Sequence, residues 1–556
     1  MPASELDRAY DRSYAALIAP GGRLVIGRDE RGLERVTNFP ATLPQFFKAF
    51  CALHGPTEAV VSGSERLTFA DLDRISDGLA GTLAARGIAK GDRVGIAMRN
   101  CTAWIVGYMA ALKAGAVATL LNGWWQVHEL DHAMTLTDPK LVLADAARAH
   151  RIGATSYAGE VVTLDVDRPI AEAIAPLSEG VDATGALPDI TPADDATILF
   201  TSGSTGEAKG AVSTHAAVTS GVYSYSASIL ALLGILTSQG RPPVNPPRTL
   251  VAVPFFHVTG EVPLLLNSFV IGRGMVLMPK WDAGEALKLI EREKITYFVG
   301  VPTMSLELMN HPDRDKYDLS SLTDITGGGA PRPVAHVERL QKSFPNSQPA
   351  LGYGLTETNA VGCGNFWGNY AAKPASTGRA LPFVEVAILD DSGRRLPTGE
   401  RGEVGIRSAA NIRGYWRNEA ATEAAFTDDG FIRSGDIGYL DDEGYLFIVD
   451  RKKDIIIRGG ENISAAEVEA ALYASPDVAE AAVFGAPCER LGEVPVAVLF
   501  AREGATLDEE ELRSFLADKL AAFKIPAHFH FADAPLPRLG TGKIDRIALK
   551  QRFADA

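Results

Sequence analysis

Short apolar runs alternate with amphipathic stretches over roughly residues 45–190. Residues 93–100 (RVGIAMRN) and 141–146 (LVLADA) are compact apolar runs, which predicts two buried strands. Residues 71–87 (DLDRISDGLAGTLAARG) repeat their apolar positions at helical spacing and end at Gly87, a residue favoured just after a helix. Strands that alternate with helices in this way predict an α/β fold with parallel pairing.

Four further apolar segments continue this pattern, and each ends in glycine, proline or a polar turn. They are residues 249–256 (TLVAVPFF), 274–281 (GMVLMPKW), 295–302 (ITYFVGVP) and 322–331 (LTDITGGGAP). Open α/β sheets bind their ligands in the loops that follow the carboxyl ends of strands. The sequence therefore predicts a ligand site where these strands end.

The pattern changes near residue 380, where helical spacing gives way to strands joined by short turns. Residues 384–408 read as a strand, a turn at Asp391, Ser392 and Gly393, and a second strand. Two more short strands are predicted within residues 430–450, again separated by an Asp-Glu-Gly turn.

A second, small domain is predicted after Asp450. A chain of 556 residues exceeds what one hydrophobic core normally serves, and the charged run at 451–454 is typical of a linker. We expect domains at residues 1–450 and 451–556. In the second, two helices are predicted to begin at capping boxes, Ser464 with Glu467 and Thr506 with Glu509, and residues 478–487 and 495–501 are predicted to pair as strands.

Composition and charge narrow the class of protein. Apolar residues make up 46% of the chain and charged residues 22%, as in ordinary globular proteins. A formal charge of −15 disfavours general binding to nucleic acid. The four cysteines are far apart and indicate neither disulfides nor a zinc site. These features predict a soluble, cytoplasmic protein.

Membrane segments are not predicted from the sequence. The N-terminus contains acidic residues and has no apolar core of the secretory type, and the most apolar run, residues 227–236, is too short to span a bilayer. That run opens an insertion-like segment, 227–247. The sequence leaves three roles open for it: a wall of a substrate tunnel, a peripheral membrane contact, or burial at an interface between domains or in a homodimer.

The segment 201–210, TSGSTGEAKG, has the composition of a phosphate-binding loop. Glycine lets backbone N–H groups approach phosphate oxygens closely, the hydroxyls of Ser202, Ser204 and Thr205 are further donors, and Lys209 adds positive charge. The loop does not fit the P-loop pattern, because Lys209 is followed by Gly210 and not by Ser or Thr. Composition alone leaves a flexible turn as the alternative.

Read whole, this loop resembles the phosphate-binding loop of the acyl-adenylate-forming superfamily, which includes acyl-CoA synthetases, luciferases and peptide-synthetase adenylation domains. Residues 351–359 (LGYGLTETN), 327–331 (GGGAP), 433–440 (RSGDIGYL) and 535–546 (PLPRLGTGKIDR) are similar to its other motifs. The resemblance covers about residues 45–550 and includes GYW at 414–416. It implies a large N-terminal α/β region with a small barrel-like β part and a small, mobile C-terminal α+β domain.

The resemblance also implies a set of binding residues. Those for ATP and AMP are Thr201, Ser202, Gly203, Ser204, Thr205, Gly206, Lys209, Gly329, Ala330, Pro331, Gly352, Tyr353, Gly354, Thr356, Asp436 and Arg451. Those for the acyl group and CoA are His257, Gly327, Gly459 and Gly460, and Lys453 is the implied hinge.

The implied roles suit the chemistry of these side chains. Tyr353 would stack on adenine, Thr356 contact the α-phosphate, and Glu357 help to hold Mg²⁺ as a hard oxygen ligand. Asp436 and Arg451 would contact the ribose hydroxyls. Lys543 would neutralise charge on the reacting carboxylate and α-phosphate.

The reaction implied is two-step: ATP and a carboxylic acid give an acyl-AMP and pyrophosphate, and coenzyme A then displaces AMP. Candidate lining residues (His257, Val258, Val301, Gly327 and residues 360–362) are small or apolar with no obvious Arg or Lys among them, which favours a hydrophobic monocarboxylic acid. Residues 489–500 and 458–464 resemble bacterial fatty-acyl and related CoA ligases most, and this resemblance puts a fatty acid first. Aryl, terpenoid and steroid acids, and a carrier protein as acceptor, stay open. So do a luciferase-like oxygenase and a nucleotide-binding regulator without turnover. The chain departs from the residues common in the superfamily at three places: Ser464–Ala465, Glu207–Ala208 and the GFIRSGD segment. These departures indicate an outlying subgroup.

Overall fold

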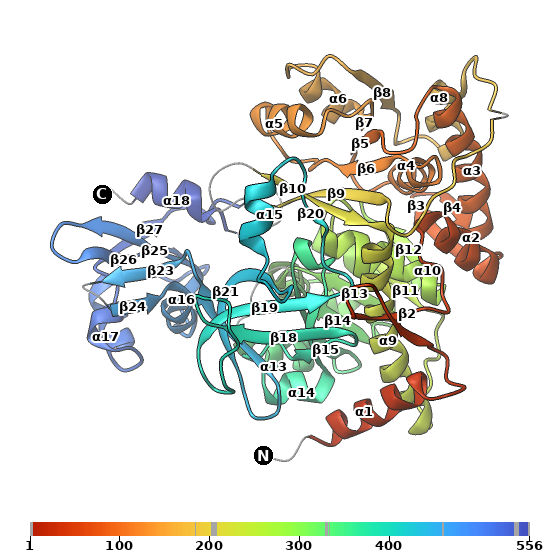
Figure 1. The fold of residues 1–556 in the computed structure, drawn as a ribbon. Coiled ribbons are helices and arrows are strands. Elements are labelled where there is room, and N and C mark those ends of the chain that lie inside the picture. Colours follow the sequence, from red (N-terminus) through yellow and green to blue (C-terminus); the bar gives the residue numbers. More distant parts are fainter. Residues whose placement is uncertain are drawn as a thin grey trace.

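Figure 1 shows the computed structural model, in which residues 4–183, 185–201, 208–328, 332, 334–458, 461–538 and 544–553 are described. A large α/β region contains two mainly parallel sheets and an antiparallel one, and a smaller sheet with its own helices follows at the C-terminal end of the chain. The predicted α/β class, with a large N-terminal and a small C-terminal part, is confirmed.

The first large sheet is seven-stranded within the described residues. Its spatial order is β20 (Gly414–Tyr415), β10 (Lys209–Thr214), β9 (Asp195–Thr201), β6 (Val117–Leu120), β5 (Arg93–Ala97), β7 (Leu141–Asp145) and β8 (Glu160–Leu164). The strands from β9 to β8 are parallel, whereas β10 and β20 are antiparallel to their neighbours. Both strands predicted at 93–100 and 141–146 are present.

The second large sheet is nine-stranded in the same part of the chain. Its order is β17 (Arg379–Ala380), β16 (Gly362–Phe366), β15 (Gln348–Gly354), β14 (Asp324–Gly327), β13 (Tyr297–Gly300), β11 (Arg248–Val251), β12 (Gly274–Leu277), β3 (Glu58–Ser62) and β4 (Glu65–Thr68). The four predicted apolar segments supply β11 to β14, which pair in parallel. Their carboxyl ends therefore meet at one edge, as expected.

The third sheet is antiparallel and corresponds to the change of pattern near residue 380. It consists of β18 (Val384–Leu389), β19 (Gly402–Ser408), β21 (Ile432–Leu440) and β22 (Leu446–Arg451). Its first strand lies beside β16 and β17 of the nine-stranded sheet. The predicted turn between β18 and β19 contains Gly393 at φ +85°, a backbone conformation that glycine adopts without strain.

The C-terminal sheet holds the last described strands: β23 (Ile455–Arg458), β24 (Glu461–Ser464), β25 (Val478–Cys488), β26 (Gly492–Ala501) and β27 (His528–Ala532). β25 and β26 pair antiparallel, as predicted. Because β22 ends at Arg451 and β23 begins at Ile455, the predicted boundary at Asp450/Arg451 falls on the last residues of β22. The division into 1–450 and 451–556 stays a prediction.

Helices cover the sheets and fill the space between them. Those of the large region are α1 (Glu5–Ile18), α2 (Leu43–His54), α3 (Phe69–Ala85), α4 (Thr102–Lys113), α5 (Val127–Thr137), α6 (Ala146–Ile152), α7 (Ile170–Ala173), α8 (Ala175–Ser178), α9 (His215–Ser238), η1 (Gly260–Leu266), α10 (Asn267–Ile271), α11 (Ala283–Glu293), α12 (Pro302–Asn310), η2 (Arg314–Lys316), α13 (Val334–Ser343), η3 (Thr356–Thr358), α14 (Trp367–Ala372) and α15 (Glu419–Ala425). Those of the C-terminal part are α16 (Ala465–Tyr473), α17 (Glu509–Ala517), η4 (Ala522–Lys524) and α18 (Arg546–Phe553), and the remaining strands are β1 (Ile26–Arg28) and β2 (Glu34–Val36). Every residue of α4 is buried, so this helix lies in the core.

The predicted helix starts are right at one position and wrong at another. Ser464 caps α16 and accepts a hydrogen bond from the backbone N–H of Glu467, as predicted. The next helix begins later than expected: α17 is capped by Asp508, whose side chain accepts from the N–H of Glu511, so Thr506 is not its cap. Aspartate is as favourable at the first capping position as a hydroxyl residue. Because the acids at 508–511 follow Thr506 so closely, the pattern does not show which residue caps the helix.

The apolar run at 227–236 belongs to a helix that is longer than the run itself. It forms part of α9, which has 24 residues and is long and apolar enough to cross a membrane by length and composition, although 67% of its most apolar window is buried. The helix α1 packs along it: Tyr10 donates to Ser228 Oγ at 3.0 Å, and Ser13 donates to the carbonyl of Ala231 at 2.8 Å. This burial inside the chain is typical of a core helix.

Candidate active site

The phosphate-loop segment connects two paired strands. Thr201 ends β9 and Lys209 begins β10, and the two lie directly opposite each other in the antiparallel register. Ser202, Gly203, Ser204, Thr205 and Gly206 lie outside the described residues. The end of β9 and the start of β10 therefore lie together at one edge of the seven-stranded sheet.

Lys209 is linked through one tyrosine to the predicted metal ligand. Its ammonium lies 5.1 Å from the ring centre of Tyr415, a cation–π contact. The Tyr415 hydroxyl donates to Glu357 Oε1 at 2.7 Å. Burial, and next the Glu357 carboxylate, raise the pKa of Tyr415, so its hydroxyl stays protonated as a donor. Three side chains from separate motifs therefore form one chain of contacts.

Magnesium fits this place as an ion that accompanies a nucleotide. The described residues contain no group of three or more His, Cys, Asp or Glu side chains that could hold a metal ion. Mg²⁺ is commonly held by only one or two carboxylates, with water and substrate phosphates completing its shell. Glu357, which contacts Tyr415 near the start of β10, would supply one such carboxylate.

The candidate adenosine residues also converge. Tyr353 on β15 donates its hydroxyl to Asp436 Oδ2 at 2.7 Å, and Arg451 Nε lies 3.0 Å from Asp436 Oδ1. Asp436 and Arg451 face each other across β21 and β22. Burial, and next Asp436, raise the pKa of Tyr353 well above its ordinary value, so the phenol stays neutral. Each carboxylate oxygen of Asp436, which is 3% exposed, keeps a second acceptor lone pair beyond the bond it already makes.

The turn after Tyr353 is strained and tightly held. Asn359 and Ala360 have φ values of +49° and +67°, which non-glycine residues rarely adopt. The Asn359 amide donates to the carbonyl of Ala410 at 2.7 Å, and the Tyr225 hydroxyl donates to the carbonyl of Ala360 at 2.7 Å. A Cβ on Gly354 would lie only 1.9 Å from that carbonyl oxygen. The glycine is therefore required for the close approach that shapes the turn carrying Thr356 and Glu357.

The acyl-site candidates lie at the ends of neighbouring segments. Gly327 is the last residue of β14, and β15, which carries Gly352, pairs with it. His257 lies in the turn that leads into η1, its ring 4.8 Å from that of Phe256. In this turn a Cβ on Gly260 would lie 2.0 Å from the carbonyl of Pro254, so glycine is needed there as well.

Two neighbours of the candidate site were not found from the sequence. The sequence assigns no role to Tyr415, although its GYW motif is similar to the corresponding residues of the superfamily. Arg332 is buried, and its guanidinium lies 2.7 Å from where a Cβ on Gly327 would be and 5.9 Å from the Tyr370 ring. It follows GGGAP directly, but nothing in the pattern indicated which way its side chain points.

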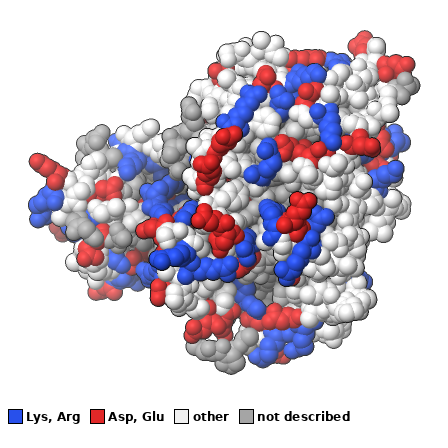
Figure 2. Space-filling model, viewed as in Figure 1, with Lys and Arg blue, Asp and Glu red and all other residues white. Residues whose placement is uncertain are grey.

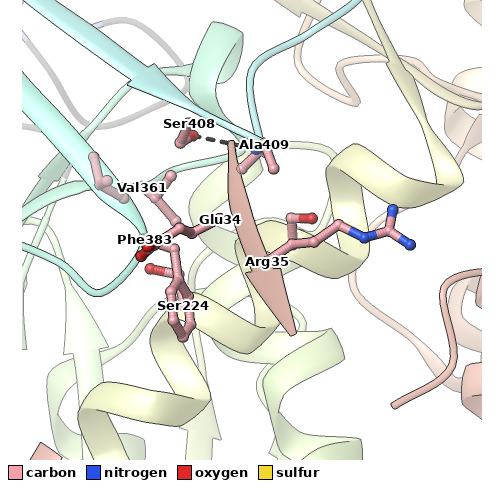
Figure 3. Close-up of a pocket in the computed structure, with 10 residues that line it drawn as sticks. Glu34, Arg35, Ser224, Val361, Phe383, Ser408 and Ala409 are labelled. Carbon is pink, nitrogen blue, oxygen red and sulfur yellow. Dashed lines mark hydrogen bonds between the residues drawn. The ribbon is translucent and has the colours of Figure 1, made fainter. Parts of the chain in front are cut away.

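The small cavity in Figure 3 is separate from this site. It lies between β2, α9 and the segment after Asn359, and Glu34, Ser224, Val361 and Ser408 are among its lining residues. Its volume is about 10 Å³, which holds roughly one water molecule. Val361, one of the sequence candidates for acyl lining, thus faces a space too small for an acyl group.

Several candidates lie outside the described residues: Gly329, Ala330, Pro331, Gly459, Gly460 and Lys543. The hinge candidate Lys453 is described and lies in the turn between β22 and β23, where the N–H of Asp454 bonds to the carbonyl of Arg451 at 2.9 Å. Burial lowers the pKa of the Lys453 ammonium. Ser464 donates to the carbonyl of Val449 at 2.9 Å, which joins the start of α16 to β22.

The fold and these motifs define an adenylate-forming enzyme, and comparison with known proteins places the chain in a family. The model of the AMP-binding enzyme family matches residues 47–416, and that of the AMP-binding enzyme C-terminal domain matches residues 467–543. The chain belongs to the AMP-binding enzyme family. The resemblance drawn from the motifs is thereby confirmed.

Individual relatives are CoA ligases of different kinds. The chain is 35% identical to a feruloyl-CoA synthase of Amycolatopsis sp, over 89% of this chain and 96% of that one. It is 32% identical to a long-chain-fatty-acid–CoA ligase of Bacillus subtilis (strain 168), over 87% and 90%. The crystal structure of ATP-bound MatB from Rhodopseudomonas palustris is similar with a TM-score of 0.82 and 29% identity, over 92% of this chain and 99% of that one.

Proposed function

We propose that the chain is an ATP-dependent acid–thiol ligase that activates a hydrophobic carboxylic acid, a fatty acid first among the candidates, and transfers the acyl group to coenzyme A. The observation that carries this proposal is the convergence of two sets of side chains from distant motifs. One set joins Tyr353, Asp436 and Arg451, and the other joins Lys209 and Glu357 through Tyr415.

In the first step a carboxylate oxygen bonds to the α-phosphorus of ATP, and the bond from that phosphorus to the pyrophosphate oxygen breaks. Tyr353, Asp436 and Arg451 hold the adenosine, and residues 201–209 hold the β- and γ-phosphates. Thr356 contacts the α-phosphate, and Lys543 neutralises the charge that gathers as the carboxylate attacks. Magnesium, held by Glu357 and the phosphates, would screen the triphosphate charge.

In the second step the thiol sulfur attacks the carbonyl carbon of the acyl-AMP, and AMP leaves with the electrons of the mixed-anhydride bond. Residues 451–556 rotate about Lys453, so that Gly459 and Gly460 replace Lys543 and leave a slot for pantetheine. The salt bridge between Arg546 and Asp454, 3.2 Å long, joins α18 to this hinge turn and supports a coupled movement.

The identity of the carboxylic acid is the most specific part of the proposal. Val258 and Ala360 are apolar and nearly buried, which supports a hydrophobic group. A feruloyl and a long-chain fatty-acid ligase are both relatives, so an aryl acid is the second candidate. The buried Arg332 beside Gly327 is a reason to test an acid with a second carboxylate as well.

Acid-dependent ATP–pyrophosphate exchange over a panel of fatty, aryl, terpenoid, steroid and dicarboxylic acids, with and without CoA, tests this function. We expect exchange without CoA for a hydrophobic acid, and CoA-dependent AMP release for the same acid. Exchange without CoA-dependent release would point to another acceptor, such as a carrier-protein phosphopantetheine. No exchange with any acid would overturn the proposal in favour of a nucleotide-binding protein. A cytoplasmic location, a peripheral membrane contact and a homodimer stay predictions.

A further inference from the structure

The segment Asn122–Gln126, which we name the NGWWQ loop, connects β6 to α5 and has no role in the function proposed above. β6 lies beside β9 and parallel to it. The carboxyl ends of parallel neighbours meet at the same edge of a sheet. The NGWWQ loop and the phosphate-loop segment therefore leave the sheet at adjacent positions.

Two arginines fix the backbone of the NGWWQ loop from α6. Arg148 Nε donates to the carbonyl of Gly123 at 2.9 Å. Arg151 donates to the same carbonyl at 2.6 Å and to the carbonyl of Trp125 at 2.7 Å. Charge-assisted hydrogen bonds to backbone carbonyls position a loop firmly.

The NGWWQ loop contacts one end of the phosphate-loop segment, and α5, which directly follows the loop, contacts the other end. The Trp125 ring lies edge-on to Phe200, at 5.1 Å between ring centres, and Phe200 precedes Thr201. At the other end His132 Nε2 lies 3.0 Å from the carbonyl of Ala208, which precedes Lys209. The loop is thus built into the wall of the candidate site.

Trp124 is the side chain of this loop that faces the His257 turn. Its ring centre is 4.9 Å from Phe256, edge to face, and 6.1 Å from His257. Phe256 is 4% exposed, but Trp124 is 37% exposed. An indole packed on one side and open on the other is a surface for binding an apolar group.

We propose that Trp124 is a specificity-determining residue for the thiol substrate, against which the carbon chain of pantetheine lies as the thiol passes His257. This rests on the proposed function. The adenosine candidates come from β15, β21 and β22, and Gly327 ends β14, whereas Trp124 is partly exposed beside the His257 turn. The substrate that arrives last from solvent is the one that meets this side chain. An indole carries no charge for phosphate, so the contact is with the apolar part of the thiol.

Two substitutions test the proposal, Trp124→Ala and Trp124→Phe, with Trp281→Phe as the control. Trp281 also stacks on a phenylalanine, Phe298, at 5.6 Å, and lies outside the candidate site. Three quantities are measured: acid-dependent ATP–pyrophosphate exchange without thiol, and thioester formation at varied CoA and at varied pantetheine, which lacks the nucleotide.

We expect Trp124→Ala to raise the KM for CoA and for pantetheine by the same factor, about tenfold, while exchange changes less than twofold. A tenfold change corresponds to about 1.4 kcal/mol. Trp124→Phe should restore most of the loss, and Trp281→Phe should leave every value unchanged. The proposal is overturned if exchange falls as far as thioester formation, if only the KM for CoA rises, or if neither KM changes. Wild-type exchange separates these outcomes from failure of the proposed function.

Discussion

Glu261 is a buried carboxyl group whose replacement should change how stability depends on pH. It is fully buried at the start of η1, and its Oε1 accepts a hydrogen bond of 2.6 Å from the Tyr108 hydroxyl. Glu261 Oε2 has no hydrogen-bond partner among the residues that the structure describes. Burial raises the pKa of Glu261 from 4.5 to about 7, and the Tyr108 bond offsets only part of this effect.

The sign of this pH dependence of stability follows from proton binding. Because the pKa of Glu261 is higher in the folded than in the unfolded state, folding takes up a proton there. The resulting stability is fully present below pH 4.5 and is lost as pH rises through about 7. The separation between these two pKa values, at about 1.4 kcal/mol per pH unit, gives a loss of about 3 kcal/mol.

The assay is the free energy of unfolding in guanidinium chloride for wild type and Glu261→Gln at pH 5 and pH 8. We expect the variant to gain about 2.5 kcal/mol on wild type between the two values, because the amide is neutral throughout and a small part of the loss has already occurred at pH 5. Glu293→Gln is the control. Burial works to raise the pKa of Glu293, but hydrogen bonds from Arg292 and Arg66 outweigh it and lower the pKa. Its stabilising effect is therefore present above pH 4.5 and lost only as pH falls below that value, so the difference between Glu293→Gln and wild type should stay constant from pH 5 to pH 8. A pH-independent difference for Glu261→Gln would refute the reasoning.

Three further substitutions test the site. Tyr415→Phe keeps the ring beside Lys209 but removes the donor to Glu357, so adenylation measured by pyrophosphate exchange should fall about 5- to 30-fold, as expected for about 1–2 kcal/mol; an unchanged rate would show that the contact has no role in positioning Glu357. Gly354→Ala puts a Cβ against the carbonyl of Ala360 and should reduce exchange and the melting temperature together, while Gly444→Ala, at an open turn, should spare exchange; normal exchange in the first variant would refute the close-approach argument. Lys453→Pro should impair thioester formation and spare exchange, because it stiffens the hinge turn; equal loss in both steps would contradict the hinge assignment.

Much of the fold could be predicted because its signals are local. The apolar runs that became β5, β7 and β11 to β14 are short and bounded by turn residues, so their type is set by neighbours within a few positions. The helix α3 shows the same: its start is fixed by a capping box at Thr68 and Asp71, and Gly87 follows its end. The start of α17 was missed, since Thr506 and Asp508 are both favoured capping residues with a glutamate three positions on, and the local pattern does not choose between them.

The length of α9 could not be predicted from its apolar run alone. Its apolar run was visible, but serines and small residues extend the helix to both sides. Whether such a helix is lipid-facing or buried depends on what covers it. Here α1, more than 200 residues away in sequence, packs along it.

The sequence by itself determined the motifs, their order and the type of chemistry that glycine-rich loops, a tyrosine, carboxylates and lysines can perform. Only the tertiary structure decided that Tyr353 bonds to Asp436, 83 residues away, and that Tyr415 links Lys209 to Glu357. It also decided that Trp124 lies against the His257 turn. The physical reason is that side-chain contacts between distant segments depend on how sheets and loops pack, and a local pattern of residue types does not encode that packing.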